Sequence, residues 1–166
     1  MSIAAAAVQP QQDTPEGETV SGALRMYQET IVVKTSERLE LVNITGRIKE
    51  LIARSGIQAG FVHLTTLHTT VSLFINEWQD ALLQDVRRLL EQLIGRDEDW
   101  QHNDPAYSDC DRMNADSHLR ALLLGHSLLL QIQKAGLVLG TFQSIILAEL
   151  DGPRERGMSV QVIGVA

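Results

Sequence analysis

The sequence predicts an α+β fold in which helices gather on one face of mostly antiparallel β-strands. Segments with strand periodicity and segments with helix periodicity follow each other in the order ββαββααβββ, which is neither regularly alternating nor all-β. The last strands are joined by short, hairpin-length connections, which are typical of antiparallel pairing. Hydrophobic residues make up 44% of the 166 residues, which is ordinary globular composition and enough for one sizeable core.

The N-terminal residues 1–22 are predicted to form a mobile tail, and residues 23–166 a single domain. The tail is rich in Ala, Gln, Pro, Gly and Thr and has neither helix nor strand periodicity. The chain has one cysteine, a net charge of −7 and no apolar run near the ~20 residues that a membrane span needs. We therefore expect a cytoplasmic protein whose partner is neither a nucleic acid nor a membrane.

Each expected element has a local signal. Alternating or continuous apolar residues predict strands at residues 26–34, 39–42, 60–65, 71–75, 127–133, 137–150 and 159–163. Helical spacing predicts three helices, the first from a cap at Thr45 to a stop at Gly56, the second across residues 82–93, and the third from a cap at Asn114 to a stop at Gly125. The polar loop at residues 96–113 is long for a small domain, and such loops are usually functional or disordered.

Three histidines in separate segments are candidate metal ligands. His68 follows a predicted strand, His102 lies in the long loop, and His118 lies near the start of the third helix. A helix start disfavours a cation, so a neutral imidazole is expected at His118, which is the form that a metal ligand or a general base requires. If the three met, they would hold a divalent ion with positions open for water or substrate. Each histidine alone is equally compatible with a structural role.

Arginine and polar side chains in the last third of the chain are candidate phosphate contacts. Arg154 and Arg156 follow the turn that begins at Asp151, and guanidinium groups match the geometry of phosphate oxygens. Thr141 and Gln143 share one face of a strand because side chains alternate. A solvated hairpin turn explains the same two arginines equally well.

Five segments occur in an order and spacing that point to a known family. They are His68-Thr69-Thr70, Asn76-Glu77, Asn114-Ala115-Asp116-Ser117-His118-Leu119, Leu139-Gly140-Thr141-Phe142-Gln143 and Asp151-Gly152-Pro153-Arg154. From about Met26 to the C-terminus the chain resembles the YjbQ family, the secondary thiamine-phosphate synthase-like proteins. No single segment is specific, and the resemblance rests on their combination.

The resemblance implies a three-layer fold of packed β-sheets with helices on one side, assembled as a homotrimer. It also implies an enzyme that joins hydroxymethylpyrimidine diphosphate to thiazole phosphate and releases diphosphate, as its main reaction or as a weak side activity. The family's recurrent polar positions match His68, Glu77, His102, His118 and Gln143. We accordingly expect catalytic roles for His68, Glu77 and His118, substrate contacts from Thr69, Thr141, Gln143, Arg154 and Arg156, and a divalent metal ion (Mg²⁺ or Zn²⁺) on His68, His102 and His118.

Two other functions stay open at this stage. One is a metal-dependent hydrolase of a small phosphorylated metabolite, in which the three histidines hold the ion and Glu77 is the base. The other is a trimeric protein that binds a ligand without catalysis. A fold resemblance by itself does not decide between them, because one fold supports many reactions.

Overall fold

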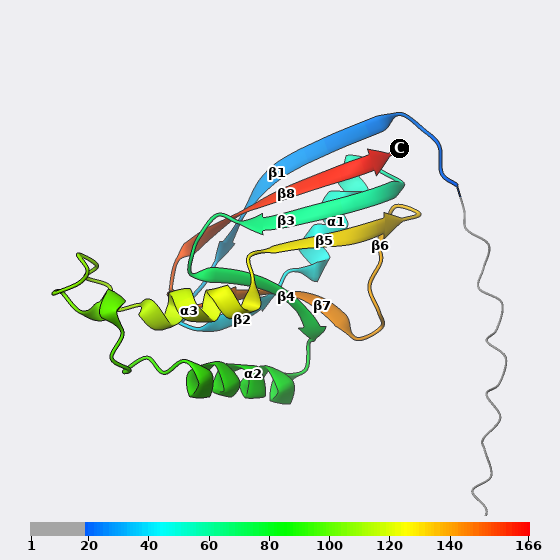
Figure 1. The fold of residues 1–166 in the computed structure, drawn as a ribbon. Helices are drawn as coiled ribbons and strands as arrows, with labels where there is room; N and C mark the ends of the chain where they lie inside the picture. Colours follow the sequence, from blue (N-terminus) through cyan, green and yellow to red (C-terminus); the bar gives the residue numbers. More distant parts are fainter. Residues whose placement is uncertain (1–18) are drawn as a thin grey trace, which may run out of the picture.

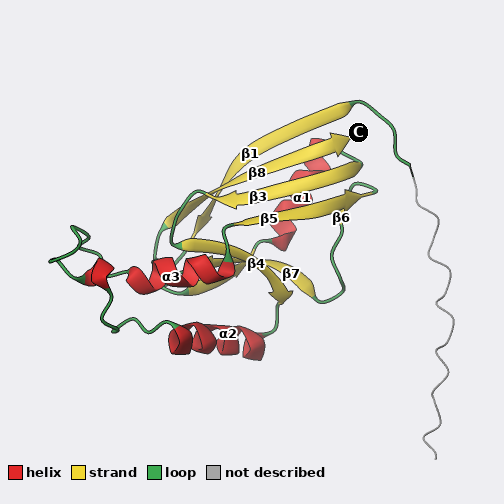
Figure 2. Ribbon diagram, viewed as in Figure 1, coloured by secondary structure: helices red, strands yellow, loops and turns green. Residues whose placement is uncertain are grey.

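The computed structural model describes residues 19–166, so most of the predicted tail, residues 1–18, lies outside the described residues. The strands form two antiparallel sheets (Figures 1 and 2). One sheet has five strands in the order β1-β8-β3-β5-β6, and the other has three in the order β2-β7-β4. The strands are β1 Leu24–Lys34, β2 Glu40–Asn43, β3 Ala59–Thr66, β4 Val71–Glu77, β5 Ser127–Gln133, β6 Gly136–Leu137, β7 Gln143–Glu149 and β8 Glu155–Val165.

The five-stranded sheet is built around β8, which pairs with β1 on one side and β3 on the other. Its inner face is apolar. Val62 of β3 lies opposite Val162 of β8, and both side chains are fully buried. Because side chains alternate along a strand, the neighbouring positions Phe61 and His63 lie on the outer face and are exposed.

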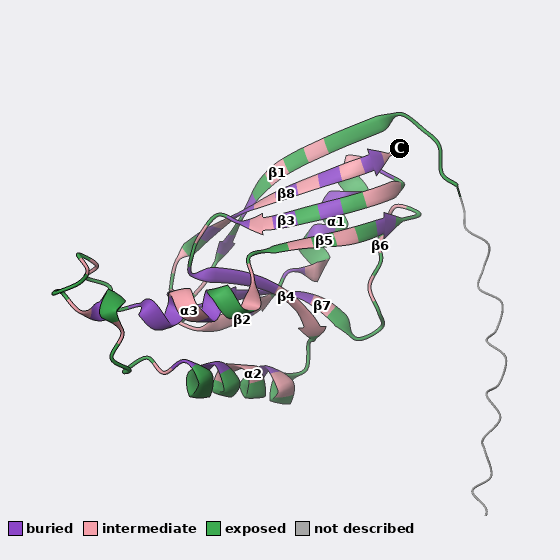
Figure 3. Cartoon of the chain, viewed as in Figure 1, coloured by how far each residue is buried: buried purple, intermediate pink, exposed green. Residues whose placement is uncertain are grey.

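The three-stranded sheet is buried on both faces, which explains the long apolar run in its central strand, β7 (Figure 3). Ile145 and Leu147 belong to the core between the two sheets. Ile146 and Ala148 point the other way, into a second apolar cluster. The single strand predicted at residues 137–150 is therefore wrong in one respect, because the chain leaves the five-stranded sheet after β6 and enters the three-stranded sheet at β7.

Helices α2 and α3 cover the outer face of the three-stranded sheet. Leu83 and Leu90 of α2 and Ala121 of α3 pack in one cluster with Ile146 of β7. This arrangement confirms the α+β, three-layer prediction, although the apolar side of α1, including Ile48, packs into the core between the sheets. The helices are α1 Thr45–Ser55, α2 Asp80–Leu93 and α3 Ala115–Leu124, with a 3₁₀ turn, η1, at Gln101–Asn103. Among the helices of residues 19–166, none is both long and apolar enough to cross a membrane.

The ends of α1 confirm one predicted signal and correct another. Gly56 follows the helix with a φ of 70°, the left-handed conformation that glycine adopts without steric cost. Thr45, however, is the first helical residue rather than the cap, and Ile44 precedes it. The Thr45 hydroxyl instead accepts a hydrogen bond from the backbone N–H of Ile145, at 2.8 Å. It therefore connects the start of α1 to β7.

Candidate functional site

The loop between β3 and β4 places His68 against β8. The backbone N–H of Gly157 donates to Nε2 of His68 at 2.9 Å, and the backbone N–H of Leu67 donates to the Gly157 carbonyl at 3.2 Å. Because Nε2 accepts a hydrogen bond, neutral His68 carries its proton on Nδ1. Burial lowers the pKa of His68 below its usual value, and the positive charge of Arg156 lowers it further against the opposing effect of Glu149. His68 is thus a neutral side chain that offers a donor at Nδ1.

The short helix η1 and the beginning of α3 bring His102 and His118 together. His102 lies in η1 and His118 in the first turns of α3, and their ring centroids are 5.0 Å apart in an edge-to-face arrangement. The side-chain oxygen of Asn103 accepts from the backbone N–H of Ala115 at 3.0 Å, which fixes η1 to the start of α3. Burial and the proximity of His102 lower the pKa of His118, while Asp151 and Asp116 oppose this shift. A negative charge entering the site would reverse the shift.

Asp151 gathers cationic side chains beside these histidines. Its carboxylate lies 3.1 Å from Arg38 Nη1, 3.4 Å from Arg112 Nη1 and 3.5 Å from Arg154 Nη2. Asn114 also donates to it at 2.9 Å, so the asparagine predicted to cap α3 stands at the N-cap position but uses its side chain on Asp151.

The cation-rich network continues through Arg38 to a second buried carboxylate. Arg38 Nη2 lies 2.8 Å from Asp116, which is completely buried at the start of α3, and Arg120 Nη1 lies 3.4 Å from the same side chain. Four guanidinium groups therefore share two carboxylates, Asp116 and Asp151, in these ion pairs. Guanidinium groups thus outnumber carboxylates in these pairs, although the whole chain has a net charge of −7.

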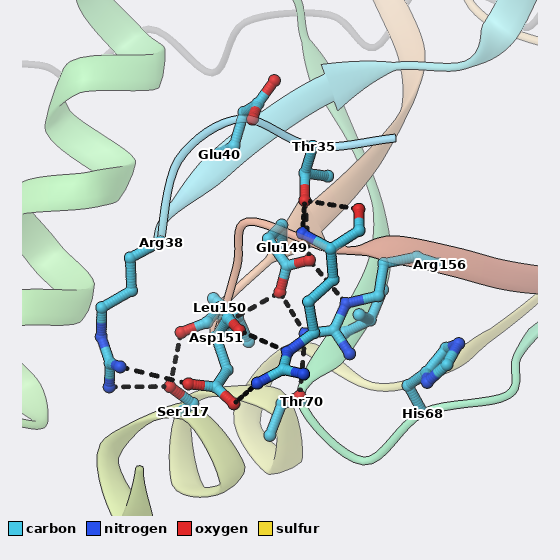
Figure 4. Close-up of polar contacts among 12 residues, drawn as sticks. Thr35, Arg38, Glu40, His68, Thr70, Ser117, Glu149, Leu150, Asp151 and Arg156 are labelled. Atoms are coloured by element: carbon cyan, nitrogen blue, oxygen red, sulfur yellow. Dashed lines mark hydrogen bonds and ion pairs between the residues drawn. The ribbon is translucent and has the colours of Figure 1, made fainter. Parts of the chain in front are cut away.

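Arg156 of β8, another residue of the site, is held by hydrogen bonds to Glu149 of β7 (Figure 4). Arg156 Nε and Nη2 each donate to one oxygen of the Glu149 carboxylate, and Nη2 also lies 3.2 Å from the hydroxyl of Thr70. Thr35 donates to Glu149 from the other side, at 3.0 Å. Because both partners are buried, the guanidinium group is fixed in orientation and its charge is balanced.

These groups surround one cavity of about 680 Å³, which we call the histidine cavity. It is lined by Leu67, His68, Thr69, Thr70, His102, Cys110, Arg112, Asn114, His118, Asp151, Arg154, Glu155 and Arg156. The structure thus brings together six of the site residues predicted from the sequence: His68, Thr69, His102, His118, Arg154 and Arg156.

The other three predicted site residues, Glu77, Thr141 and Gln143, lie elsewhere. Glu77 is the last residue of β4 and pairs with Gln143 at the beginning of β7. β4 starts next to the histidine cavity at Val71, so at ~3.3 Å per residue its far end is roughly 20 Å away. Gln143 uses its side-chain oxygen to accept from the backbone N–H of Gly140 at 2.8 Å. The structure therefore separates Glu77 from the histidines that it was expected to assist.

Comparison with known proteins identifies the family. The family described as UPF0047 protein YjbQ-like matches residues 29–165. This chain belongs to the UPF0047 (YjbQ-like) family. A UPF0047 protein of Methanothermobacter thermautotrophicus is 40% identical over 85% of this chain and 94% of its own length. The UPF0047 protein YugU of Bacillus subtilis is 28% identical over 81% of this chain and 98% of its own length.

Solved structures of family members have the same fold. A YbjQ-like protein of unknown function from Sulfolobus solfataricus has a TM-score of 0.79 and 32% identity, covering 86% of this chain and 99% of the other. A hypothetical protein from Aeropyrum pernix has a TM-score of 0.77 and 30% identity, covering 83% and 98%. Both support the fold that the predicted resemblance to the YjbQ family implies.

Two expectations drawn from the resemblance need correction. The relatives carry only the UPF0047 family name, or are described as proteins of unknown function, so a place in thiamine biosynthesis is not supported. The metal site is also corrected, because residues 19–166 contain no group of three or more His, Cys, Asp or Glu side chains arranged to hold an ion. The geometry of His68 gives a physical reason, since its Nε2 lone pair already accepts from Gly157.

Several residues at or beside the histidine cavity were not predicted from the sequence. Arg112 lies in the polar loop, where no periodicity assigns a position to a side chain. Arg38 lies between β1 and β2, far from the other segments in sequence. Glu149 did leave a signal: it is a carboxylate directly after the apolar run 145–148, and a buried charge requires a partner.

Proposed function

We propose that the histidine cavity binds a small phosphorylated molecule, and that the protein acts on it by proton transfer. The surplus of guanidinium groups around Asp151 carries this proposal. Among residues 19–166, Asp151 is the only carboxylate in an ion pair with Arg112 or Arg154, and it also pairs with Arg38, so one negative charge is divided among these groups. The other carboxylate that lines the cavity, Glu155, pairs with Lys34. Guanidinium groups bind phosphate through paired, charge-assisted hydrogen bonds.

The histidines supply the other half of the proposed chemistry. His68, with its proton on Nδ1, donates to a phosphate oxygen without changing its own charge. His118 is neutral when the cavity is free, because burial and His102 lower its pKa. A bound phosphate raises that pKa and loads His118 with a proton. When a water molecule attacks the phosphorus and the P–O bond breaks, the proton held on His118 is transferred to the oxygen that leaves, so His118 serves as the general acid.

A binding experiment tests the first part. Titration calorimetry with inorganic phosphate is expected to show saturable binding. Arg112→Gln is expected to weaken it by roughly tenfold to a hundredfold, the loss typical of one charge-assisted hydrogen bond. The Arg112 side chain is 49% exposed, so this variant should fold normally. Arg47→Gln is the matched control, because Arg47 is exposed on α1, where it donates to the carbonyl of Val32. Equal affinities for both variants would contradict the proposal.

A turnover experiment tests the second part. Release of phosphate and of diphosphate is measured with a panel of phosphate monoesters and organic diphosphates. We expect His118→Gln to lose most of the turnover while retaining most of its affinity for inorganic phosphate at pH 8, where proton uptake by His118 adds least to binding and Arg112 and Arg154 remain in place. Binding without any turnover in the unmodified protein would limit the function to ligand binding.

A further inference from the structure

A second hollow lies on the other side of His68 and His118, and its character differs from that of the histidine cavity. It measures about 510 Å³, and its apolar walls are Leu67, Leu119, Ala121 and Leu122, beside the polar side chains of Thr66 and His126. Its lining residues include no carboxylate and no guanidinium group. We call it the leucine hollow. It shares Leu67, His68, Thr69 and His118 with the histidine cavity, so the same side chains form a wall of both.

The leucines of this hollow come from two separate elements. Leu67 lies in the β3–β4 loop and is 58% exposed, while Leu122 lies on α3 and is 72% exposed. A single exposed leucine on a protein surface is ordinary, but two that line one hollow beside a polar site form a concave apolar surface. Such a surface gains free energy when an apolar group displaces water from it.

We infer that the molecule bound through its phosphate in the histidine cavity carries an apolar organic group, and that this group occupies the leucine hollow. The inference rests on the proposed function. The expected substrates are phosphate esters or diphosphates of apolar alcohols, rather than sugar phosphates, whose hydroxyl groups would lose their hydrogen bonds against leucine side chains. The volume lies within the roughly 300–1,000 Å³ that small-molecule sites usually have.

The position of the hollow favours this occupant. A phosphate bound between His68 and His118 would lie against side chains that line both spaces, so the group that it carries could enter the leucine hollow. A smaller hollow of about 320 Å³ beside Trp100 also reaches His118, but its lining includes neither His68 nor Thr69. The leucine hollow shares four lining residues with the histidine cavity, whereas the smaller hollow shares two, His102 and His118.

Two phosphonates test the inference, because their carbon–phosphorus bond is not cleaved by proton transfer. Calorimetry is used to compare methylphosphonate with hexylphosphonate, which have the same anionic group. We expect hexylphosphonate to bind roughly tenfold more tightly or better, as the extra methylene groups leave water. Equal affinities would overturn the inference while leaving phosphate binding intact. Failure of methylphosphonate and inorganic phosphate to bind at all would instead overturn the proposed function, and the inference with it.

Matched variants on α3 locate the apolar group. Leu122→Ser is expected to remove most of the gain of hexylphosphonate and to leave the affinity for methylphosphonate unchanged. Leu123→Ser is the control, because Leu123 is 60% exposed on the same helix but does not line the hollow. An equal loss in both variants overturns the inference. A change in the assembled mass of the Leu122→Ser variant, measured by light scattering, also overturns the inference, because these leucines would then contact another copy of the chain.

Discussion

The carboxylate of Glu149 accepts hydrogen bonds from both Nε and Nη2 of Arg156, and the two side chains are almost completely buried. The pair joins β7 of the three-stranded sheet to β8 of the five-stranded sheet, and Arg156 lines the histidine cavity. It therefore connects the two layers at the point where the site is built. Its partners Thr35 and Thr70 satisfy further hydrogen-bonding positions of both charged groups.

Glu149→Gln is expected to lower the free energy of unfolding by about 3–5 kcal/mol, because it leaves the buried charge of Arg156 without its counterion. Urea unfolding followed by circular dichroism measures the change. Glu155→Gln is the control: Glu155 is the next glutamate in the chain and pairs with Lys34 on the surface, so its loss should leave stability nearly unchanged. A similar loss in both variants would contradict the assigned role of the buried pair.

Gly152→Ala is expected to destabilise the fold through a direct clash. A Cβ atom at this position would lie 2.7 Å from Cγ of Glu149 and closer still to the carbonyl oxygen of Glu37. Backbone and a buried side chain cannot both move aside, so a loss of about 1–3 kcal/mol follows. Gly46→Ala is the control, because no atom lies within 4 Å of its added Cβ and alanine favours the helix α1. Thermal unfolding of the two variants should shift in opposite directions.

Much of the fold could be predicted because it depends on local patterns. The helical spacing of α2 and the glycine after α1 each describe a property of neighbouring residues. The division of residues 137–150 between two sheets could not be predicted in this way. It depends on which distant strands pair with β6 and with β7, and the amino acids of residues 137–150 do not identify these partners.

The candidate site shows the same division. The chemistry of histidine suggested that His68, His102 and His118 could form one site, and all three line the histidine cavity. Glu77 follows His68 closely in sequence, yet an extended strand carries it away, so closeness in sequence was misleading. Arg38 was missed for the opposite reason: only the folded chain brings it to Asp151.

The homotrimer stays a prediction, and the outer face of the five-stranded sheet is where it can be tested. Met26, Phe61 and Leu129 are all more than half exposed, and the strand register places them on this face. Light scattering at micromolar concentration should give a trimer, and Phe61→Lys should lower the mass. Leu89→Lys is the control, because Leu89 is comparably exposed on α2, away from that sheet. A monomeric unmodified protein would contradict the prediction.

Binding of an anion to the histidine cavity is expected to strengthen as the pH falls. In the free protein, burial and His102 lower the pKa of His118, so the residue stays neutral to a lower pH than an ordinary histidine does. A bound anion raises that pKa, and binding therefore takes up a proton. Sulfate is the appropriate probe, because its charge is constant between about pH 5 and 8, where histidine titrates. Its affinity should increase towards pH 5, and His118→Gln should flatten this increase. His63→Gln, remote from the cavity on the outer face of the five-stranded sheet, should behave as the unmodified protein does. An affinity independent of pH would contradict the assignment of His118 as the proton-accepting group.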